Sequence, residues 1–450
     1  MIQSPKKGNW YIENLFIYLL MGYLLIGKIY ATLHIPFTPV YIGEIFLLIG
    51  LLKLRNKALD MRRFYFIIIF ILIGLINLAI NVSTYKLEAV RDFAMIYYSL
   101  FFIIGYYNIS EKSLHKLRIT LLNCIKYVVP SLLLIRIIKS LFQPTLNEFT
   151  YESVALFATK SGDIQVYLVL FMTLLISNSK SKIIKYKNFY YLMCGALLIS
   201  TASLNRGGFV AFSFALLIGF RHFNFHQKIS SFYILIFAVF IIFSGVEIAD
   251  VRPDSRGRQI SITQLRENII SLFSSDTNNA GRTQGTKKWR MEFWSTLIGE
   301  VTENPNTMWL GLGLGPNLLS QFEQFAVDDE DSERKTKHPH NYTINIFSRL
   351  GIIGLFGWLF VLFCFFRQAI PMLLFSKKRP TLAWSFTLLV IAGLINSNFD
   401  VYLENPMGAI IFWVSMGIAS KCIKIESKVD LLAAAEKNRQ SPKFPLIPSP

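Results

Sequence analysis

One histidine and two arginines are the side chains of this sequence that are best suited to chemistry. His340 stands where a long polar stretch gives way to an apolar run. An unperturbed imidazole titrates near neutral pH, so His340 is a candidate general base. Arg206 precedes Gly207 and Gly208 in a turn between two apolar segments. A guanidinium beside glycine amides at a helix N-terminus forms a ready site for phosphate oxygens.

Arg290 is the second arginine, and each of the three residues has an ordinary structural alternative. Arg290 is expected at the start of a helix, with Trp294 one turn further on. An arginine there could simply pack over the tryptophan. Arg206 could snorkel or pair with a loop carboxylate, and His340 could form hydrogen bonds at the junction between loop and helix.

Three other motifs offer different chemistry, but each has a plainer interpretation. His338 and His340 form an H-x-H pair, yet no third ligand is placed near them, so we predict no metal. Asp328–Asp331 could bind a divalent cation, whereas such a run is usually a solvated loop. Gly311–Pro316 lacks both the G-x-G-x-x-G spacing and a βαβ context. We interpret it as a flexible turn and predict no nucleotide and no other cofactor.

The elements that position these residues are predicted to be membrane helices. Hydrophobic residues make up 53% of the 450 residues and charged residues 16%, against roughly 25% charged residues in a soluble domain. We therefore predict an all-α, polytopic integral membrane protein with about 12 transmembrane helices, each a window of roughly 15 to 23 residues. The windows lie near 12–33, 40–54, 64–81, 93–108, 118–140, 164–178, 189–204, 208–222, 231–248, 346–367, 381–396 and 406–423.

The basic residues indicate how the chain is oriented. The formal net charge is +18, and lysines and arginines gather in every connection from an even-numbered to an odd-numbered span. By the positive-inside rule, both termini are then cytoplasmic. The positive charge is mostly a topology signal, so nucleic acid is excluded as a partner. The partner that the composition implies is the lipid bilayer.

Four regions follow from this pattern. Residues 1–249 hold spans 1–9, 250–341 form an extracytoplasmic cap, 342–425 hold spans 10–12, and 426–450 form a disordered cytoplasmic tail. The cap is predicted to be mainly helical, because apolar residues recur at helical spacing in two stretches. These residues are Ile262, Leu265, Ile269, Ile270 and Phe273, and Trp289, Phe293, Trp294, Leu297, Ile298 and Val301.

Three stretches together resemble the O-antigen ligase and polymerase superfamily of bacterial membrane glycosyltransferases. The first is the arginine-glycine turn Ser203–Gly208, in which Asn205 stands where the family usually has serine. The second runs from Arg290 and Trp294 through Asn304-Pro305 to the Gly-x-Gly stretch that ends at Gly315. The third is His340-Asn341 followed by the glycine-rich Leu350–Leu355. The order of these motifs, with a large outward loop between spans nine and ten, is similar to that of the family.

The resemblance implies a GT-C-like fold and a glycosyl transfer at the outer face of the bacterial inner membrane. The donor would be a glycan on undecaprenyl diphosphate, a polyprenyl carrier, and the acceptor a hydroxyl of a lipid A core sugar or a growing polysaccharide. Arg206 and Arg290 would neutralise the diphosphate, and His340 would be the base of an inverting, metal-independent reaction. The substrate-binding set would be completed by Asn341, Arg91 and Glu44.

Two questions stay open at the level of the sequence. A ligase, a polymerase and a protein O-glycosylating enzyme differ in their acceptors, which the sequence does not distinguish. A transporter or flippase of lipid-linked saccharide is the alternative, since twelve spans suit it as well. Transporters tend to carry internal repeats and ionisable residues near the bilayer midplane. Here the ionisable residues gather at the outer helix ends, which favours the transferase.

Overall fold

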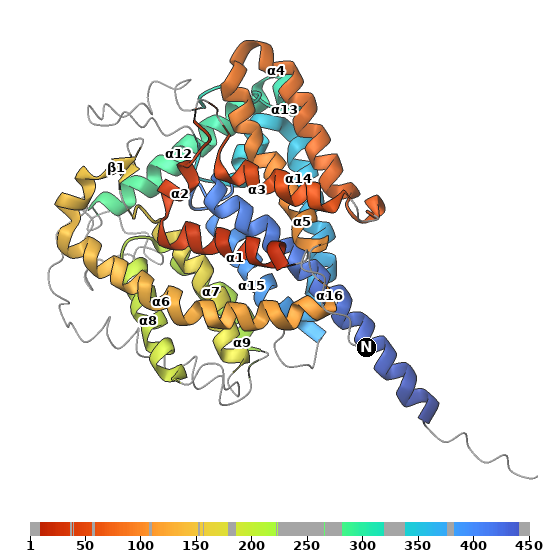
Figure 1. The fold of residues 1–450 in the computed structure, drawn as a ribbon. Helices are drawn as coiled ribbons and strands as arrows, with labels where there is room; N and C mark the ends of the chain where they lie inside the picture. The colour runs from red at the N-terminus through yellow and green to blue at the C-terminus, as the bar shows by residue number, and fades with distance from the viewer. Residues whose placement is uncertain are drawn as a thin grey trace, which may run out of the picture.

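The protein is a mostly helical bundle, seen here in a computed structural model (Figure 1). The structure describes residues 10–36, 38, 40–55, 59–107, 110–151, 154–155, 157–178, 186–221, 223, 265, 281–318, 338–375 and 382–440. Its helices are α1 (Trp10–Leu25), α2 (Lys28–Thr32), α3 (Ile42–Leu54), η2 (Met61–Arg63), α4 (Tyr65–Tyr97), η3 (Tyr98–Leu100), α5 (Phe101–Tyr107), α6 (Glu111–Glu148), α7 (Ser161–Ser177), α8 (Lys187–Ala202), α9 (Arg206–Phe220), α12 (Gly281–Glu303), α13 (Pro305–Leu310), α14 (Tyr342–Phe375), α15 (Leu382–Asn396) and α16 (Pro406–Gln440). Strands β1 (Thr150–Tyr151) and β2 (Val154–Ala155) pair antiparallel.

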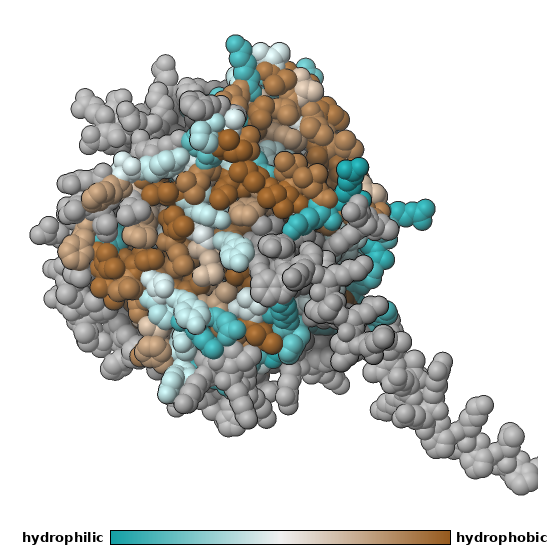
Figure 2. All heavy atoms as spheres, in the orientation of Figure 1, coloured by the Kyte–Doolittle hydropathy of each residue, from teal (hydrophilic) through white to brown (hydrophobic). Residues whose placement is uncertain are grey.

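The apolar helices confirm a membrane protein. In the described residues, four helical stretches are long and apolar enough to cross a bilayer, and four shorter apolar helices accompany them. Large apolar side chains are exposed on α3 and α4, such as Leu48 at 60% and Ile76 at 61%. Figure 2 shows the apolar surface that they form. Lipid would cover such a surface. The count of twelve spans stays a prediction, and the window 231–248 lies outside the described residues.

Helix α4 doubles back on itself. Its backbone leaves helical geometry at Lys86, with φ 47° and ψ −120°. Gly74 in the first arm packs closely against Phe93 and Ile96 in the second. The two arms therefore form an antiparallel hairpin, which corresponds to the predicted windows 64–81 and 93–108.

Helices α7 and α15 form the centre of the bundle. Both are buried along almost their whole length, as expected for helices that are apolar on all sides. Helix α15 contacts α7, α9 and α16. The turn between α15 and α16, residues 397–405, is thereby held against the ends of α7 and α9. Helix α16 continues to Gln440 and extends away from the bundle (Figure 1), where the sequence predicted a disordered tail from residue 426.

The predicted second cap helix is present as α12. Phe293, Leu297 and Val301 are fully buried on one face, as the periodicity predicted. Ile298 was assigned to this face as well, but it is 39% exposed. The helix begins at Gly281, so Arg290 lies within it and not at its start. The first predicted cap helix lies outside the described residues apart from Leu265, which packs on α8.

A break in α14 joins the cap to the membrane helices. Gly351 has φ 63° inside this helix, so the carbonyls of Ser348 and Arg349 lose their helical partners. They accept instead from the amides of Leu312, at 2.7 Å, and Gly313, at 3.1 Å. Amides of the Gly-x-Gly stretch, Gly311–Gly315, thus replace the hydrogen-bond donors that these carbonyls lack at the break. The stretch is fixed in place, whereas the sequence predicted a flexible turn.

Substitution at the break in α14 should destabilise the protein. Gly351→Ala puts a Cβ against the backbone of Trp309 at a positive φ, which alone costs roughly 1–2 kcal/mol. We expect a lower thermal unfolding midpoint in detergent. Gly299→Ala is the matched control, because a Cβ there meets nothing within 4 Å and alanine favours a helix by roughly 0.5–1 kcal/mol. Equal midpoints for the two variants would contradict the role of the break.

Candidate functional site

A buried carboxylate lies at the centre of the candidate site. Asp400, in the 397–405 turn, accepts from its neighbour Val401 N at 2.8 Å and from Asn205 Nδ2 at 3.4 Å. Lys160 Nζ and His340 Nδ1 each lie 3.8 Å from its Oδ1. One side chain therefore connects the start of α7, the N-cap of α9, the segment before α14 and the 397–405 turn.

The charge of Asp400 is set by these neighbours. Burial alone would favour the neutral carboxyl, but Lys160, His340 and the Val401 amide hold the pKa of Asp400 well below its ordinary value. The group is therefore an anion at neutral pH. A buried anion of this kind stabilises cations around it.

The backbone holds His340 in an unusual conformation beside Asp400. His340 has φ 55°, and the segment is fixed on both sides. Trp294 Nε1 donates to Pro339 O at 2.7 Å, and Tyr342 N donates to Ser397 O at 2.8 Å. The His340 side chain is 26% exposed, with Nδ1 turned to Asp400. Asn341 Oδ1 accepts from Ile344 N at 3.1 Å, so Asn341 caps α14, and the residue facing the imidazole is Asp400.

The two arginines approach the same turn from the other side. Arg290 Nη1 donates to Phe399 O at 3.0 Å. Arg206 is the first residue of α9, whose N-cap Asn205 accepts from Gly208 N at 2.9 Å. The predicted helix N-terminus at Arg206 is therefore present. Gly207 packs directly against Phe399, which a larger residue would prevent.

The electrostatics of Arg290 show that these cations are close together. Burial lowers the pKa of Arg290, the charge of Asp400 raises it, and the charge of Arg206 lowers it further. Neighbouring cations in a partly buried place favour the binding of anions. The structure therefore brings His340, Arg290 and Arg206 to one turn, at Phe399–Asp400.

Sequence reasoning missed Asp400 and Lys160. Asp400 lies in a short connection between two apolar windows, 381–396 and 406–423, on the predicted outer side. Acidic residues in such a connection were a usable signal, since Arg206 was chosen on the same ground. Lys160 immediately precedes an apolar window, and nothing in its local sequence distinguishes it from an ordinary flanking lysine.

Glu44 and Arg91 take part in other contacts. Glu44 Oε1 accepts from the hydroxyls of Tyr97, at 2.7 Å, and Tyr98, at 2.8 Å. Arg91 is about half exposed and pairs with Glu88 at 2.9 Å. Among the described residues, neither shows a contact with His340, Arg206 or Arg290.

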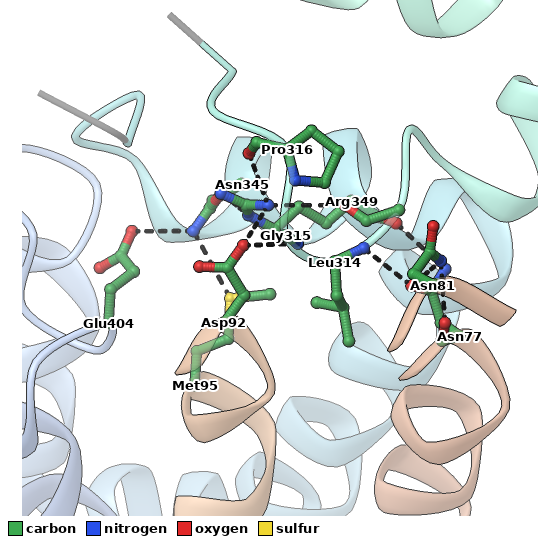
Figure 3. A network of polar contacts seen from close by, with 11 residues as sticks. Asn77, Asn81, Asp92, Met95, Leu314, Gly315, Pro316, Asn345, Arg349 and Glu404 are labelled. Atoms are coloured by element: carbon green, nitrogen blue, oxygen red, sulfur yellow. Dashed lines mark hydrogen bonds and ion pairs between the residues drawn. The ribbon is translucent and has the colours of Figure 1, made fainter. Parts of the chain in front are cut away.

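A second polar network is centred on Arg349 of α14 and extends to Glu404 in the 397–405 turn (Figure 3). Arg349 is 1% exposed, and its Nη1 lies 2.5 Å from Asp92 Oδ2. Asp92 Oδ2 also accepts from Gly315 N at 2.8 Å, and Arg349 donates to Pro316 O at 3.2 Å. The buried ion pair therefore fixes the α4 hairpin and the Gly-x-Gly stretch to α14. Asp92, and not its neighbour Arg91, is the residue of that pair that reaches the core of the structure.

The network continues to the 397–405 turn. Arg349 Nε donates to Asn345 Oδ1 at 3.1 Å, and Asn345 Nδ2 donates to Glu404 Oε1 at 3.4 Å. The pKa of Glu404 is raised to about 8, mainly by burial and also by the charge of Asp400, while Lys160 and Asn345 oppose the shift. Glu404 is therefore largely protonated at neutral pH, four residues from the ionised Asp400.

The described residues contain no group of three or more His, Cys, Asp or Glu side chains that could hold a metal ion. The acidic run Asp328–Asp331 lies outside them. His338 is described, and its neighbour His340 faces Asp400.

One comparison with known proteins bears on this geometry. A family model described as "O-Antigen ligase" matches residues 166–359, the stretch that holds the three motifs, and so supports the resemblance that they carry. The matched region includes Arg206, Arg290 and His340, and it ends before Asp400. No curated protein matches the chain at a significant level.

The protonated state of Glu404 should make stability fall as pH rises. Its folded pKa is about 8 against an ordinary 4.5, so its contribution is complete below about pH 4.5. That contribution is lost as pH rises towards 8, by about 1.4 kcal/mol for each unit of pKa difference. Glu404→Gln, which mimics the neutral carboxyl, should make the thermal unfolding midpoint depend less on pH between pH 5 and 8. Exposed Glu300→Gln is the control, and parallel curves for Glu404→Gln and wild type would contradict the assignment.

Proposed function

We propose that this membrane protein, whose residues 166–359 form an O-antigen ligase family domain, is a glycosyltransferase acting on a lipid-linked glycan. The donor is a glycan on a polyprenyl diphosphate, and the acceptor is a hydroxyl of a saccharide. The observation that carries the proposal is the convergence of a histidine, held beside a buried carboxylate, and two arginines on one turn, Phe399–Asp400.

His340 is the base in this proposal. Asp400 faces Nδ1, which favours the tautomer with its proton on Nδ1 and leaves Nε2 free to accept a proton. The acceptor oxygen attacks the anomeric carbon while its proton passes to Nε2. The bond from that carbon to the diphosphate oxygen breaks, and the diphosphate leaves with the electron pair. A single displacement of this kind inverts the anomeric configuration. Asp400 then stabilises the imidazolium.

The arginines bind the leaving group. Negative charge grows on the diphosphate as the glycosidic bond breaks, and fixed cations at that place lower the barrier. Arg290 has one nitrogen on Phe399 O, and its buried Nε has no hydrogen-bond partner among the described residues. Arg206 adds a guanidinium at the N-terminus of α9, where backbone amides also favour phosphate. We propose no metal and no cofactor for this step.

The remaining predicted binding residues act away from the reacting atoms in this proposal. Asn341 supports His340 by capping α14. Glu44 and Arg91 would contact the saccharide away from the reacting carbon, because their own contacts lie on α3 and α4. The bundle itself would hold the lipid chain, and the site would face the periplasm from the inner membrane.

Removal of His340 should abolish transfer. His340→Ala should lower the rate by about 10²–10⁴-fold, the usual contribution of a general base, while the protein stays folded and inserted. Asp400→Asn should also be impaired and should change the pH dependence of the rate. His115→Ala, on an exposed histidine of α6, is the control. Surface polysaccharide run on a gel from complemented deletion strains measures the outcome, and normal glycan from His340→Ala would exclude this base.

The acceptor class can be read from the same deletion strain. A polymerase defect leaves only single repeats, because chain growth stops. A ligase defect leaves full-length glycan on its carrier. A transporter defect would instead leave the lipid-linked donor on the cytoplasmic side, where a membrane-impermeant probe of the sugar would not label it in intact cells.

Arg206 should not be replaceable by lysine. A lysine keeps the charge but loses the planar fork that binds two phosphate oxygens. We expect Arg206→Lys to lose about 10–100-fold in transfer rate, the worth of a charged hydrogen bond. Arg221→Lys, at the other end of α9, is the matched control. Full activity of Arg206→Lys would place the diphosphate elsewhere.

A further inference from the structure

A second buried arginine lies next to the candidate site and has no acidic partner among the residues that the structure describes. Arg136, on α6, is 7% exposed. Its Nη2 donates to Ser161 Oγ at 3.0 Å, and its buried Nε has no hydrogen-bond partner among the described residues. A buried guanidinium in a membrane helix is costly unless an anion or polar groups compensate its charge.

The guanidinium is directed at the open end of a long helix. Ser161 is the first residue of α7, a helix of 17 residues, and the N-cap Lys160 makes no side-chain capping bond. The first amides of a helix lack internal partners and carry partial positive charge. Lys160 itself is turned away, because its Nζ donates to Val401 O at 2.7 Å. Ser161 is only partly buried.

The one acidic residue in the first turn of α7 does not fill this place. Asp163 interacts with Lys160, Asp400 and Lys28, and Arg136 is not among the charges that act on it. Asp163 therefore belongs to the Asp400 side of the helix. The Arg136 side combines a cation, a hydroxyl and first-turn amides that show no side-chain cap in the described part of the chain, which is the chemistry of an oxyanion site.

We propose that Arg136, Ser161 and the N-terminus of α7 form a second oxyanion site, for a carboxylate or phosphate group on the glycan. The inference rests on the proposed function, in which the reacting diphosphate is held by Arg206 and Arg290. The two sites border each other through Lys160, which precedes Ser161 and contacts Asp400. A glycan with an acidic group near its reducing end would be held at two points, and neutral glycans at one.

Direct binding tests this site without relying on transfer. Purified full-length protein in detergent is titrated with sodium phosphate and, separately, sodium glucuronate, and the unfolding midpoint is followed. Glucose at matched ionic strength is the reference. Arg136→Gln should weaken the apparent affinity for at least one anion by about tenfold or more, the worth of one charged hydrogen-bond pair. The probe that loses affinity identifies the group, phosphate or carboxylate.

Matched variants separate this site from its neighbour. Arg118→Gln, at the other end of α6 and bonded to Asn178, should bind as wild type. Arg290→Gln should retain the Arg136-dependent part of the binding. Ser161→Ala, which keeps the arginine, should weaken binding to a smaller extent, so it carries the test if Arg136→Gln fails to fold. Wild-type affinity in both Arg136→Gln and Ser161→Ala, or no stabilisation of wild type by either anion, would overturn the proposal.

The outcome is distinguishable from failure of the proposed function. If His340→Ala remains active while Arg136→Gln loses anion binding, the base assignment fails and the oxyanion site stands. If His340→Ala is inactive and Arg136→Gln binds both anions normally, the transferase assignment stands and the second site is wrong.

Discussion

The arrangement of the candidate site depends on one negative charge, Asp400, which lies where the starts of α7, α9 and α14 come together. A buried carboxylate is tolerated only with compensating partners. Here the compensation comes from the start of α7, through Lys160, and from the segment before α14, through His340. The same turn receives Arg290 through the Phe399 carbonyl. Residues far apart in the sequence therefore lie together because they contact the Asp400 carboxylate and the Phe399 carbonyl of one short turn.

The turn would not hold its position without the broken helix beneath it. Gly351 interrupts α14, and the carbonyls released there bind the Gly-x-Gly stretch. Arg349, two residues before the break, then reaches Asp92 and Asn345, and Asn345 reaches Glu404 (Figure 3). Cap, hairpin and turn are thus joined by a network whose members are all buried or partly buried. Such networks specify one arrangement when they are fully satisfied.

The sequence was sufficient for the class of fold and for three residues of the site. Hydropathy predicts membrane helices because lipid imposes length and apolarity locally, and the motifs around Arg206, Arg290 and His340 are local as well. Lys160 and Arg349 could not be assigned in this way, and for Asp400 the sequence offers only its acidic character in a short outer connection. Their roles come from contacts between distant segments, and a single sequence carries no record of such pairing. Asn341 illustrates the limit: its position beside His340 suggested that it orients the ring, but its side chain caps α14.

Several positive charges lie close together around the assembled turn. Lys160 acts on the ionised Asp400, and Arg206 lies close enough to act on Arg290, while Glu404 is held largely neutral, mainly by burial. Neighbouring cations are costly where the surroundings are poor in water, because like charges repel more strongly there. An anionic ligand relieves that cost, and a ligand that becomes more negative during reaction relieves it further. Under the proposed function, the cations that disfavour one another in the empty site are the ones that would stabilise a leaving diphosphate.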